Sequence, residues 1–266
     1  MKIALITTAA PLKSHPGVGC YNVNQANAMS ELGSPMELFL VQPYIPRFLA
    51  RHFPRFRDLY ERTGVEKIDG VPTHVISGMM LHPRTMRRRV SPRFPWLSSY
   101  FVSWAVTRKL IKALNNFNPD IILFHDFRIW GRVSEKLCKE FNCSFAIIEH
   151  AYRDVMSLDD KTRLGKYYLN KSAKADVIYV VGKEMQEHLK QIGAKNVVLI
   201  NNGTKIPDEI ELRKPNRWKE RKVILCVGCY RAFDEQGRPR KGHEYLIRAF
   251  ANAKLGNTIL SLVGKP

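Results

Sequence analysis

Two histidines lie where short apolar segments of the chain end, and an imidazole in that position can bind a ligand or move a proton. His125 closes the apolar segment 121–125 and is followed by Asp126, and His150 directly follows segment 145–149. Ligands bind at the carboxyl ends of strands in doubly wound sheets, which favours a functional role for His150. The alternatives are that His150 is a buried core histidine and that His125 and Asp126 only cap a loop.

A glycine-containing loop is the first candidate phosphate site. Gly17 and Gly19 lie in Pro16-Gly-Val-Gly19, just before a helix predicted to begin near Tyr21. Backbone N–H groups at a helix N-terminus bind anions, and glycine allows a close approach. The same pattern is also typical of a plain turn. The third glycine of the dinucleotide-binding fingerprint is missing, which disfavours a nicotinamide dehydrogenase.

The second candidate phosphate site follows Gly228. Its loop carries cationic side chains that include Arg231 and Lys241, and a helix is predicted after it. Such a pocket suits a diphosphate, although a solvated basic loop has the same composition. A Walker loop is excluded, because the chain contains no G-x-x-x-x-G-K-[ST] sequence.

Strands and helices alternate along the first 200 residues and must position these loops. Strands are predicted at 3–8, 36–42, 73–77, 121–125, 145–149, 177–181 and 197–200, and helices at 21–32, 96–115, 130–141, 161–173 and 184–192. Continuous Val, Ile and Leu runs with intervening helices indicate an α/β fold with a parallel, Rossmann-like sheet covered on both faces. Asn202 follows the last strand, so it joins the candidate residues at the same sheet edge.

The chain is predicted to contain one whole domain and the start of another. We expect an N-terminal domain over 1–201, a polar linker over 202–221 and a second Rossmann-like domain beginning at 222. The last segment contains one strand–helix–strand unit, which is too little to cover both faces of a parallel sheet. The second domain is therefore expected to be incomplete within 222–266.

The net charge of +19 indicates an anionic partner. Between Arg47 and Arg108 there are twelve Lys or Arg and four Asp or Glu, interleaved with aromatic residues. Arg87, Arg88 and Arg89 beside Trp96 form the candidate membrane anchor. Nucleic-acid binding and a solvated basic face are the alternatives. The N-terminus does not resemble a signal peptide and no apolar run is long enough to span a bilayer, so a cytoplasmic location is expected, with peripheral contact at the inner face of the membrane.

Several segments, taken in order, carry a resemblance to a known family. They are Lys2-Ile-Ala-Leu-Ile-Thr-Thr with Pro16-Gly-Val-Gly19, Asn118-Pro-Asp-Ile-Ile-Leu-Phe-His125-Asp126, Ile147-Ile-Glu-His150, Ala175-Asp-Val-Ile, Ile200-Asn-Asn-Gly203, and 223–250 with Lys241-Gly242. On these segments the chain resembles the nucleotide-sugar glycosyltransferases of the GT-B fold, specifically the large retaining family four (glycosyl transferases group 1).

The resemblance implies a role for each candidate site residue. Gly17, Gly19, Gly228, Arg231 and Lys241 would contact the donor phosphates. His150 would be the catalytic residue beside the transferred sugar, with His125, Asp126 and Asn202 in the acceptor-side cleft. No metal and no cofactor other than the nucleotide-sugar substrate is implied.

The expected reaction is transfer of a sugar from a nucleotide-sugar to a glycolipid, a lipopolysaccharide precursor or another cell-envelope glycan precursor. Such acceptors make a membrane surface a more favoured partner than nucleic acid. The family's paired glutamates, which hold the donor, would lie beyond Pro266, in a missing C-terminal half or a partner chain. Two alternatives stay open: a GT-B sugar epimerase, and a non-catalytic truncated module that binds anionic surfaces.

Overall fold

The computed structural model describes residues 1–14, 16–78, 90–203, 216–228 and 242–263. The chain divides into two compact units, Met1–Thr204 and Lys205–Pro266. Each unit is described by itself below.

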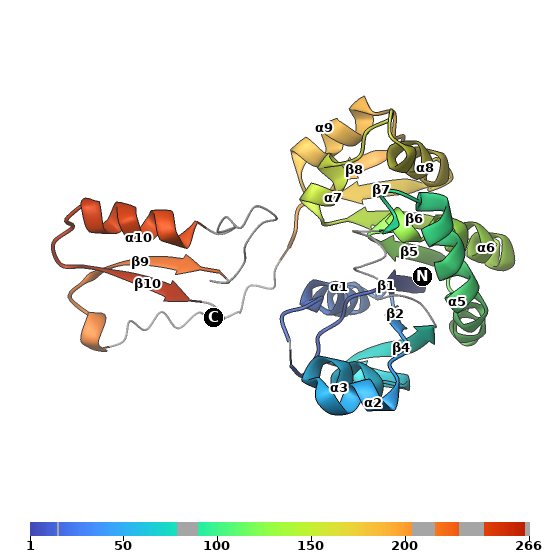
Figure 1. The fold of residues 1–266 in the computed structure, drawn as a ribbon, viewed down its shortest axis with the longest axis horizontal. Helices are drawn as coiled ribbons and strands as arrows, with labels where there is room; N and C mark the ends of the chain where they lie inside the picture. The colour runs from blue at the N-terminus through green and yellow to red at the C-terminus, as the bar shows by residue number, and fades with distance from the viewer. Residues whose placement is uncertain (15, 79–89, 204–215, 229–241, 264–266) are drawn as a thin grey trace. The chain divides into compact units, whose positions relative to one another are not determined.

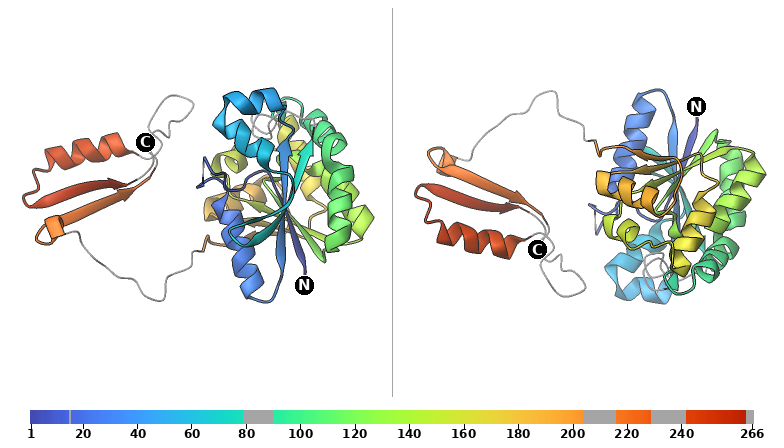
Figure 2. Two further views of the ribbon diagram at one scale, coloured as in Figure 1. Left: turned by 90° about the horizontal axis from the view of Figure 1, so that it is seen from below. Right: turned by 90° about the horizontal axis from the view of Figure 1, so that it is seen from above.

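The first unit is built on an eight-stranded sheet with helices packed on it (Figures 1 and 2). Its elements are, in chain order, β1 (Ile3–Thr7), α1 (Cys20–Glu31), β2 (Met36–Pro43), α2 (Arg47–His52), α3 (Pro54–Glu61), β3 (Gly64–Ile68), β4 (Val71–Gly78), α5 (Pro95–Phe117), β5 (Ile121–His125), η2 (Phe127–Ile129), α6 (Gly131–Phe141), β6 (Ser144–Glu149), α7 (Tyr152–Met156), α8 (Arg163–Ser172), β7 (Val177–Val180), α9 (Lys183–Gln191) and β8 (Val197–Leu199).

The strand order is β3-β4-β2-β1-β5-β6-β7-β8, and every neighbouring pair is parallel except β3 with β4. The chain leaves β1 toward β2 and later returns to the other side of β1 at β5. In sheets of this kind, the point where the strand order reverses opens a crevice at the carboxyl ends of the strands. The expected α/β, Rossmann-like class is therefore confirmed.

The apolar strands explain why both faces of the sheet are covered. Along β1, Ala4 and Ile6 join the core on one face, whereas Ile3 and Leu5 join the core on the other. The first core includes buried residues of α5, α6, α8 and α9, and the second includes residues of α1. Burial on both faces accounts for the unbroken apolar runs in the sequence.

Several elements of the first unit differ from the sequence-based expectation, among them β3, α2, α3 and α7. Strand β3 has a single buried residue, Ile68, and pairs with β4 as an antiparallel edge strand. The basic aromatic segment after β2 forms the short helices α2 and α3, which follow Pro46 and begin at Pro54. Proline suits the first turn of a helix, so these prolines start helices rather than extend a loop.

The second unit contains η3 (Asn216–Trp218), β9 (Lys222–Val227), α10 (His243–Asn252) and β10 (Thr258–Val263). β9 and β10 pair in parallel, with Thr258 opposite Lys222. The strand–helix–strand order expected for this segment is therefore present. Among its described residues, Leu225, Val227 and Tyr245 are exposed.

Candidate functional site

Three aromatic rings meet at the carboxyl edge of the sheet. Tyr21 lies in the first turn of α1, His125 ends β5, and His150 follows β6. The ring centroids are 4.7 Å apart for His125 and His150, 5.1 Å for Tyr21 and His125, and 5.0 Å for Tyr21 and His150. The structure thus brings together the two histidines predicted from the sequence. Tyr21 was not predicted as a site residue, although an aromatic side chain directly after the Gly19 loop was a signal for it.

The loop between β1 and α1 is held by the buried side chain of Asn22. Its Nδ2 donates to Thr7 Oγ1 at 2.9 Å and to the Ala9 carbonyl at 2.7 Å. Gly19 precedes α1 with a positive φ of 69°, and its Cα lies against the backbone of Ala9. These contacts fix the start of α1, and Tyr21 with it, against the end of β1.

Buried hydrogen bonds hold the strand ends that carry the two histidines. The Glu149 carboxylate accepts hydrogen bonds from the Phe127 N–H at 3.1 Å and from the Tyr168 hydroxyl at 3.3 Å. Burial, reinforced by this carboxylate, raises the pKa of Tyr168 well above 10, so the phenol stays protonated and donates. Trp130 Nε1 donates to the His125 carbonyl at 3.0 Å. These hydrogen bonds therefore fix the backbone at the ends of β5 and β6.

The two imidazoles differ in how they are held. His125 is buried and its Nδ1 lies 3.5 Å from Asp126 Oδ2. Burial and the charge of neighbouring His125 lower the pKa of His150 from 6.5 to about 4, partly offset by Asp126 and by a side-chain hydrogen bond with Asn202. His150 is therefore neutral near pH 7. The Nε2 atoms of both rings are buried and have no hydrogen-bond partner among the described residues.

Because the folded chain binds a proton at His150 less readily than the unfolded chain does, stability should depend on pH. The native state should be fully stable with respect to this group above pH 6.5 and lose stability as pH falls toward 4. We expect a loss of about 2 kcal/mol, since solvent reaches part of the ring and screens the penalty. Urea denaturation at a series of pH values should show a flatter profile for His150→Gln. The matched variant His52→Gln, at an exposed histidine, should retain the wild-type profile; equal flattening in both variants would contradict the assignment.

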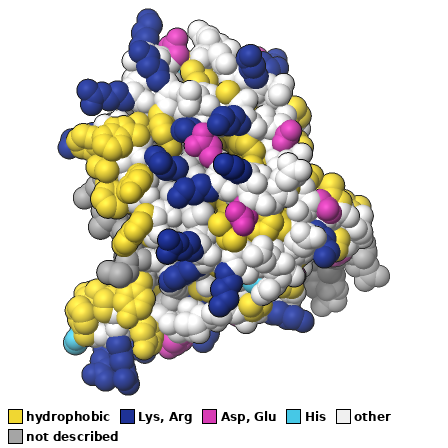
Figure 3. Space-filling view, turned by 90° about the vertical axis from the view of Figure 1, so that its right-hand side faces the viewer, with side chains coloured by type: hydrophobic (Ala, Val, Ile, Leu, Met, Phe, Trp, Pro, Cys, Tyr) yellow, Lys and Arg dark blue, Asp and Glu magenta, His cyan; other side chains and the backbone are white. Residues whose placement is uncertain are grey.

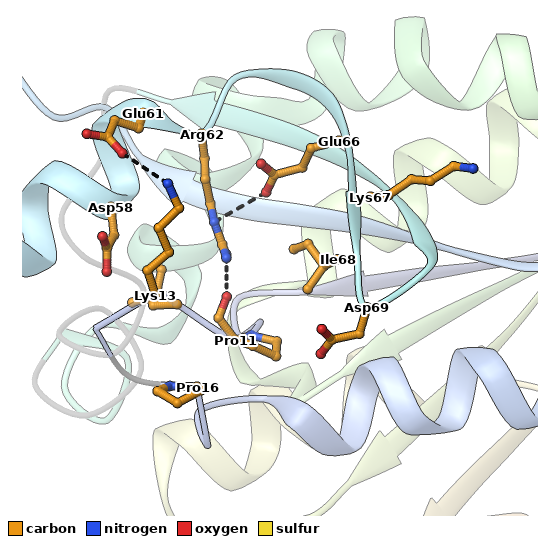
Figure 4. Close-up of a pocket in the computed structure, with 11 residues that line it drawn as sticks. Pro11, Lys13, Pro16, Asp58, Glu61, Arg62, Glu66, Lys67, Ile68 and Asp69 are labelled. Carbon is orange, nitrogen blue, oxygen red and sulfur yellow. Dashed lines mark hydrogen bonds and ion pairs between the residues drawn. The ribbon is translucent and has the colours of Figure 1, made fainter.

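A separate cavity of about 360 Å³ lies beside the loop that follows β1 (Figure 4). Its charged lining residues come from that loop, from α3, from the β3–β4 hairpin and from Arg62, which lies between α3 and β3. The Arg62 guanidinium donates to the Pro11 carbonyl and lies 3.2 Å from Glu66 Oε1. Carboxylates and a guanidinium around one cavity can hydrogen-bond a polar ligand such as a sugar. Nothing in the spacing of the sequence pointed to this cavity.

The remaining predicted residues are distributed as follows. Gly17 is exposed in the loop before α1, and a Cβ at this position would meet no atom within 4 Å. Asn202 lies in the first unit beside His150, whereas Gly228 lies in the second unit after β9. Arg231 and Lys241 lie outside the described residues, as do Arg87, Arg88 and Arg89. Trp96 is an exposed residue of α5.

Across the described ranges, no group of three or more His, Cys, Asp and Glu side chains is placed to hold a metal ion. In the same part of the chain, no helix is long and apolar enough to cross a membrane.

Solved structures of other proteins have a fold similar to that of this chain. Sucrose-phosphate synthase from Thermosynechococcus elongatus is 15% identical, over 100% of this chain and 71% of its own, with a TM-score of 0.54. An E. coli protein described as trehalose-6-phosphate, bound with UDP-2-fluoro glucose, is 10% identical, over 98% of this chain and 64% of its own, with a TM-score of 0.56. The chain thus spans slightly less than two thirds of the E. coli protein, and at these identities the likeness concerns the fold.

The sequence comparison identifies the family. No curated protein sequence matches the chain significantly. The sequence model of Glycosyltransferase Family 4 matches residues 17–206, which include Gly17 and Gly19 before α1, both histidines and the end of the sheet. The Rossmann-like first unit agrees with the GT-B fold of its structural neighbours. The chain therefore belongs to Glycosyltransferase Family 4.

Proposed function

We propose that the chain contributes the acceptor-side domain of a retaining glycosyltransferase that takes its sugar from a nucleotide-sugar. The observation that carries this proposal is the Tyr21, His125 and His150 cluster, which lies where the strand order reverses. A neutral imidazole with an unoccupied Nε2 can hydrogen-bond a sugar hydroxyl, and an aromatic ring can pack on the sugar's apolar face. The likeness to a fold solved with UDP-2-fluoro glucose supports a nucleotide-sugar donor.

The proposed roles divide between binding and positioning. His150 contacts the transferred sugar, and Tyr21, His125, Asp126 and Asn202 shape the pocket around it. Gly17 and Gly19 leave room for the donor phosphates at the start of α1, where helix N–H groups favour negative charge.

The second unit is proposed to bind the donor diphosphate. Gly228, Arg231 and Lys241 bind the diphosphate and stabilise it as it departs, which is the electrostatic form of catalysis. No metal is required in this proposal.

The proposed acceptor is a glycolipid, a lipopolysaccharide precursor or another cell-envelope glycan precursor. The protein is proposed to work in the cytoplasm at an anionic membrane surface. The basic, aromatic composition of the first unit supports this assignment.

The donor site can be tested without knowing the acceptor. UDP-glucose, UDP-N-acetylglucosamine and GDP-mannose are titrated into the chain while the imidazole signals are followed by NMR, with His150 assigned through His150→Gln. We expect at least one donor to shift the His150 and His125 signals at millimolar concentration, and UDP or GDP alone to shift them less. The exposed His52 is the internal control. No shift at His150 with any donor, or an equal shift at His52, would overturn the proposal and favour a non-catalytic binding module.

A further inference from the structure

We infer that the outer face of α5 is a membrane-binding surface, which inserts Trp96, Tyr100 and Trp104 into the interfacial region of an anionic bilayer. This inference rests on the proposed function only for the statement that the acceptor lies at a membrane. The aromatic face itself is observed independently of any sugar chemistry.

Helix α5 has two faces of opposite character. Its inner face packs into the core through residues that include Val102, Val106, Leu110 and Leu114, all fully buried. Its outer face carries Trp96, Tyr100 and Trp104 at successive spacings of four residues, so they lie in one stripe along the helix. Their exposed fractions are 62%, 48% and 65%. The stripe is therefore not needed to hold the helix to the sheet.

The stripe belongs to a larger apolar surface. Phe94 and Phe101 are also about half exposed, so five aromatic side chains together present roughly 500 Å² to solvent. An exposed apolar patch of that size is at the upper end of what monomeric proteins show, and such patches are often functional. Figure 3 shows hydrophobic side chains gathered along one margin of the molecule, over α5 and again over α2 and α3, with Lys and Arg side chains beside them. Phe48 and Phe53 contribute exposed rings at α2.

The charge that α5 itself carries has one sign. The sequence contains no Asp or Glu between Asp69 and Asp120. The C-terminal half of α5 presents Arg108 and Lys112 on its exposed side, and Arg132 of α6 lies over the Tyr100 ring at 5.1 Å from its centroid. A helix that joins aromatic rings to basic residues and carries no acidic one is complementary to an anionic lipid headgroup layer.

The aromatic types favour lipid over the other partners. Trp and Tyr concentrate at the membrane–water interface because one end of each ring system is apolar and the other is polar. Proteins that stack single-stranded nucleic acid do so in grooves, whereas these rings lie on the outer surface of a single helix. Since α5 is not a membrane-spanning helix, it would lie in the plane of the interface.

The aromatic half of α5 also lies on the functional side of the sheet. The Ser99 hydroxyl accepts a hydrogen bond from the Arg132 N–H at the start of α6, which follows the carboxyl end of β5. The other end of α5 is near the amino end of β1, because Lys2 Nζ donates to the Phe117 carbonyl at 3.2 Å. A bilayer on the aromatic half would therefore face the same edge as His125 and His150. An acceptor with a lipid tail could remain in that bilayer while its headgroup reached the site.

The test uses the whole chain with vesicles and needs neither donor nor acceptor. Vesicles of phosphatidylglycerol and phosphatidylcholine in equal parts are compared with pure phosphatidylcholine by co-sedimentation. We expect binding to require phosphatidylglycerol and to weaken as salt is raised. Acyl chains brominated near the headgroup should quench Trp96 and Trp104 fluorescence, and Trp96→Phe with Trp104→Phe should remove the quenching while retaining most of the binding.

The matched variants distinguish insertion of the α5 side chains from nonspecific hydrophobic adsorption to the vesicles. The triple variant Trp96→Ser, Tyr100→Ser, Trp104→Ser should lower the partition coefficient at least about tenfold. Leu32→Ser, Val198→Ser and Tyr245→Ser, which alter exposed apolar residues elsewhere, should change it less than about twofold.

Four results would overturn the inference. They are equal loss in the two triple variants, binding to anionic vesicles without quenching, self-association that only the α5 variant abolishes, and RNA binding that only the α5 variant abolishes. The third would identify a second copy as the partner, and the fourth would identify nucleic acid. None of the four would bear on donor binding at His150.

Discussion

Replacing Trp130 by alanine should lower the free energy of unfolding by about 3–5 kcal/mol. The Trp130 side chain is 0% exposed and its ring packs against Phe124, with the centroids 6.2 Å apart. Its removal leaves a cavity that the surrounding strands and helices cannot fully close. It also removes the hydrogen bond from Nε1 to the His125 carbonyl. Urea denaturation followed by circular dichroism measures the loss.

Two further variants separate the causes of this effect. Trp130→Phe keeps most of the volume and removes the indole N–H, so it should be destabilised by only about 1–2 kcal/mol. Trp104→Ala makes the same truncation at a residue that is 65% exposed, and it should change stability by less than about 0.5 kcal/mol. If Trp104→Ala were as destabilising as Trp130→Ala, cavity formation could not be the cause, and α5 variants could not serve as folded probes of membrane binding.

The fold was predictable wherever strands are buried on both faces. Strand β5 has the expected bounds, and the other central strands differ by one to two residues at their ends, because continuous apolar runs mark such strands directly. Strand β3 had no such signal, since only Ile68 of its residues is buried. Helices α2 and α3 were obscured because they are short and their prolines also suit turns.

The sequence predicted which strand ends carry the site residues. It did not predict how their side chains are arranged. The positions of His125 and His150 follow from where β5 and β6 end, and the sequence indicates both ends. Their stacking depends on the register that sets His125 opposite Ile148 and on the direction of each ring, which no sequence pattern fixes. Glu149 was expected only as the polar end of a strand. It is instead a buried acceptor for Phe127 and Tyr168, and that role depends on residues far apart in sequence.

Replacing Gly19 by alanine should destabilise the first unit by about 3 kcal/mol and displace the start of α1. The backbone at Gly19 has φ of 69°, where a side chain costs roughly 1–2 kcal/mol. A Cβ would also lie 2.5 Å from the Ala9 carbonyl carbon and 2.7 Å from the Ala10 nitrogen. Because these atoms belong to the backbone, the overlap can be relieved only by moving the loop, which adds a similar cost. Tyr21 would move with the helix and lose its place against the histidines.

Gly17→Ala is the matched control two residues earlier in the same loop. A Cβ there would meet no protein atom within 4 Å, so we expect stability to change by less than about 0.5 kcal/mol. If the donor phosphates lie against this loop as proposed, the added methyl group would obstruct them without disturbing the fold. Gly17→Ala should then weaken the NMR response of His150 to the nucleotide-sugars while its urea denaturation curve stays that of the wild type. Gly19→Ala should change both measurements. A Gly17→Ala chain that responds to the donors as the wild type does would place the phosphates elsewhere, and a Gly19→Ala chain of wild-type stability would show that the loop has room to move away from Ala9.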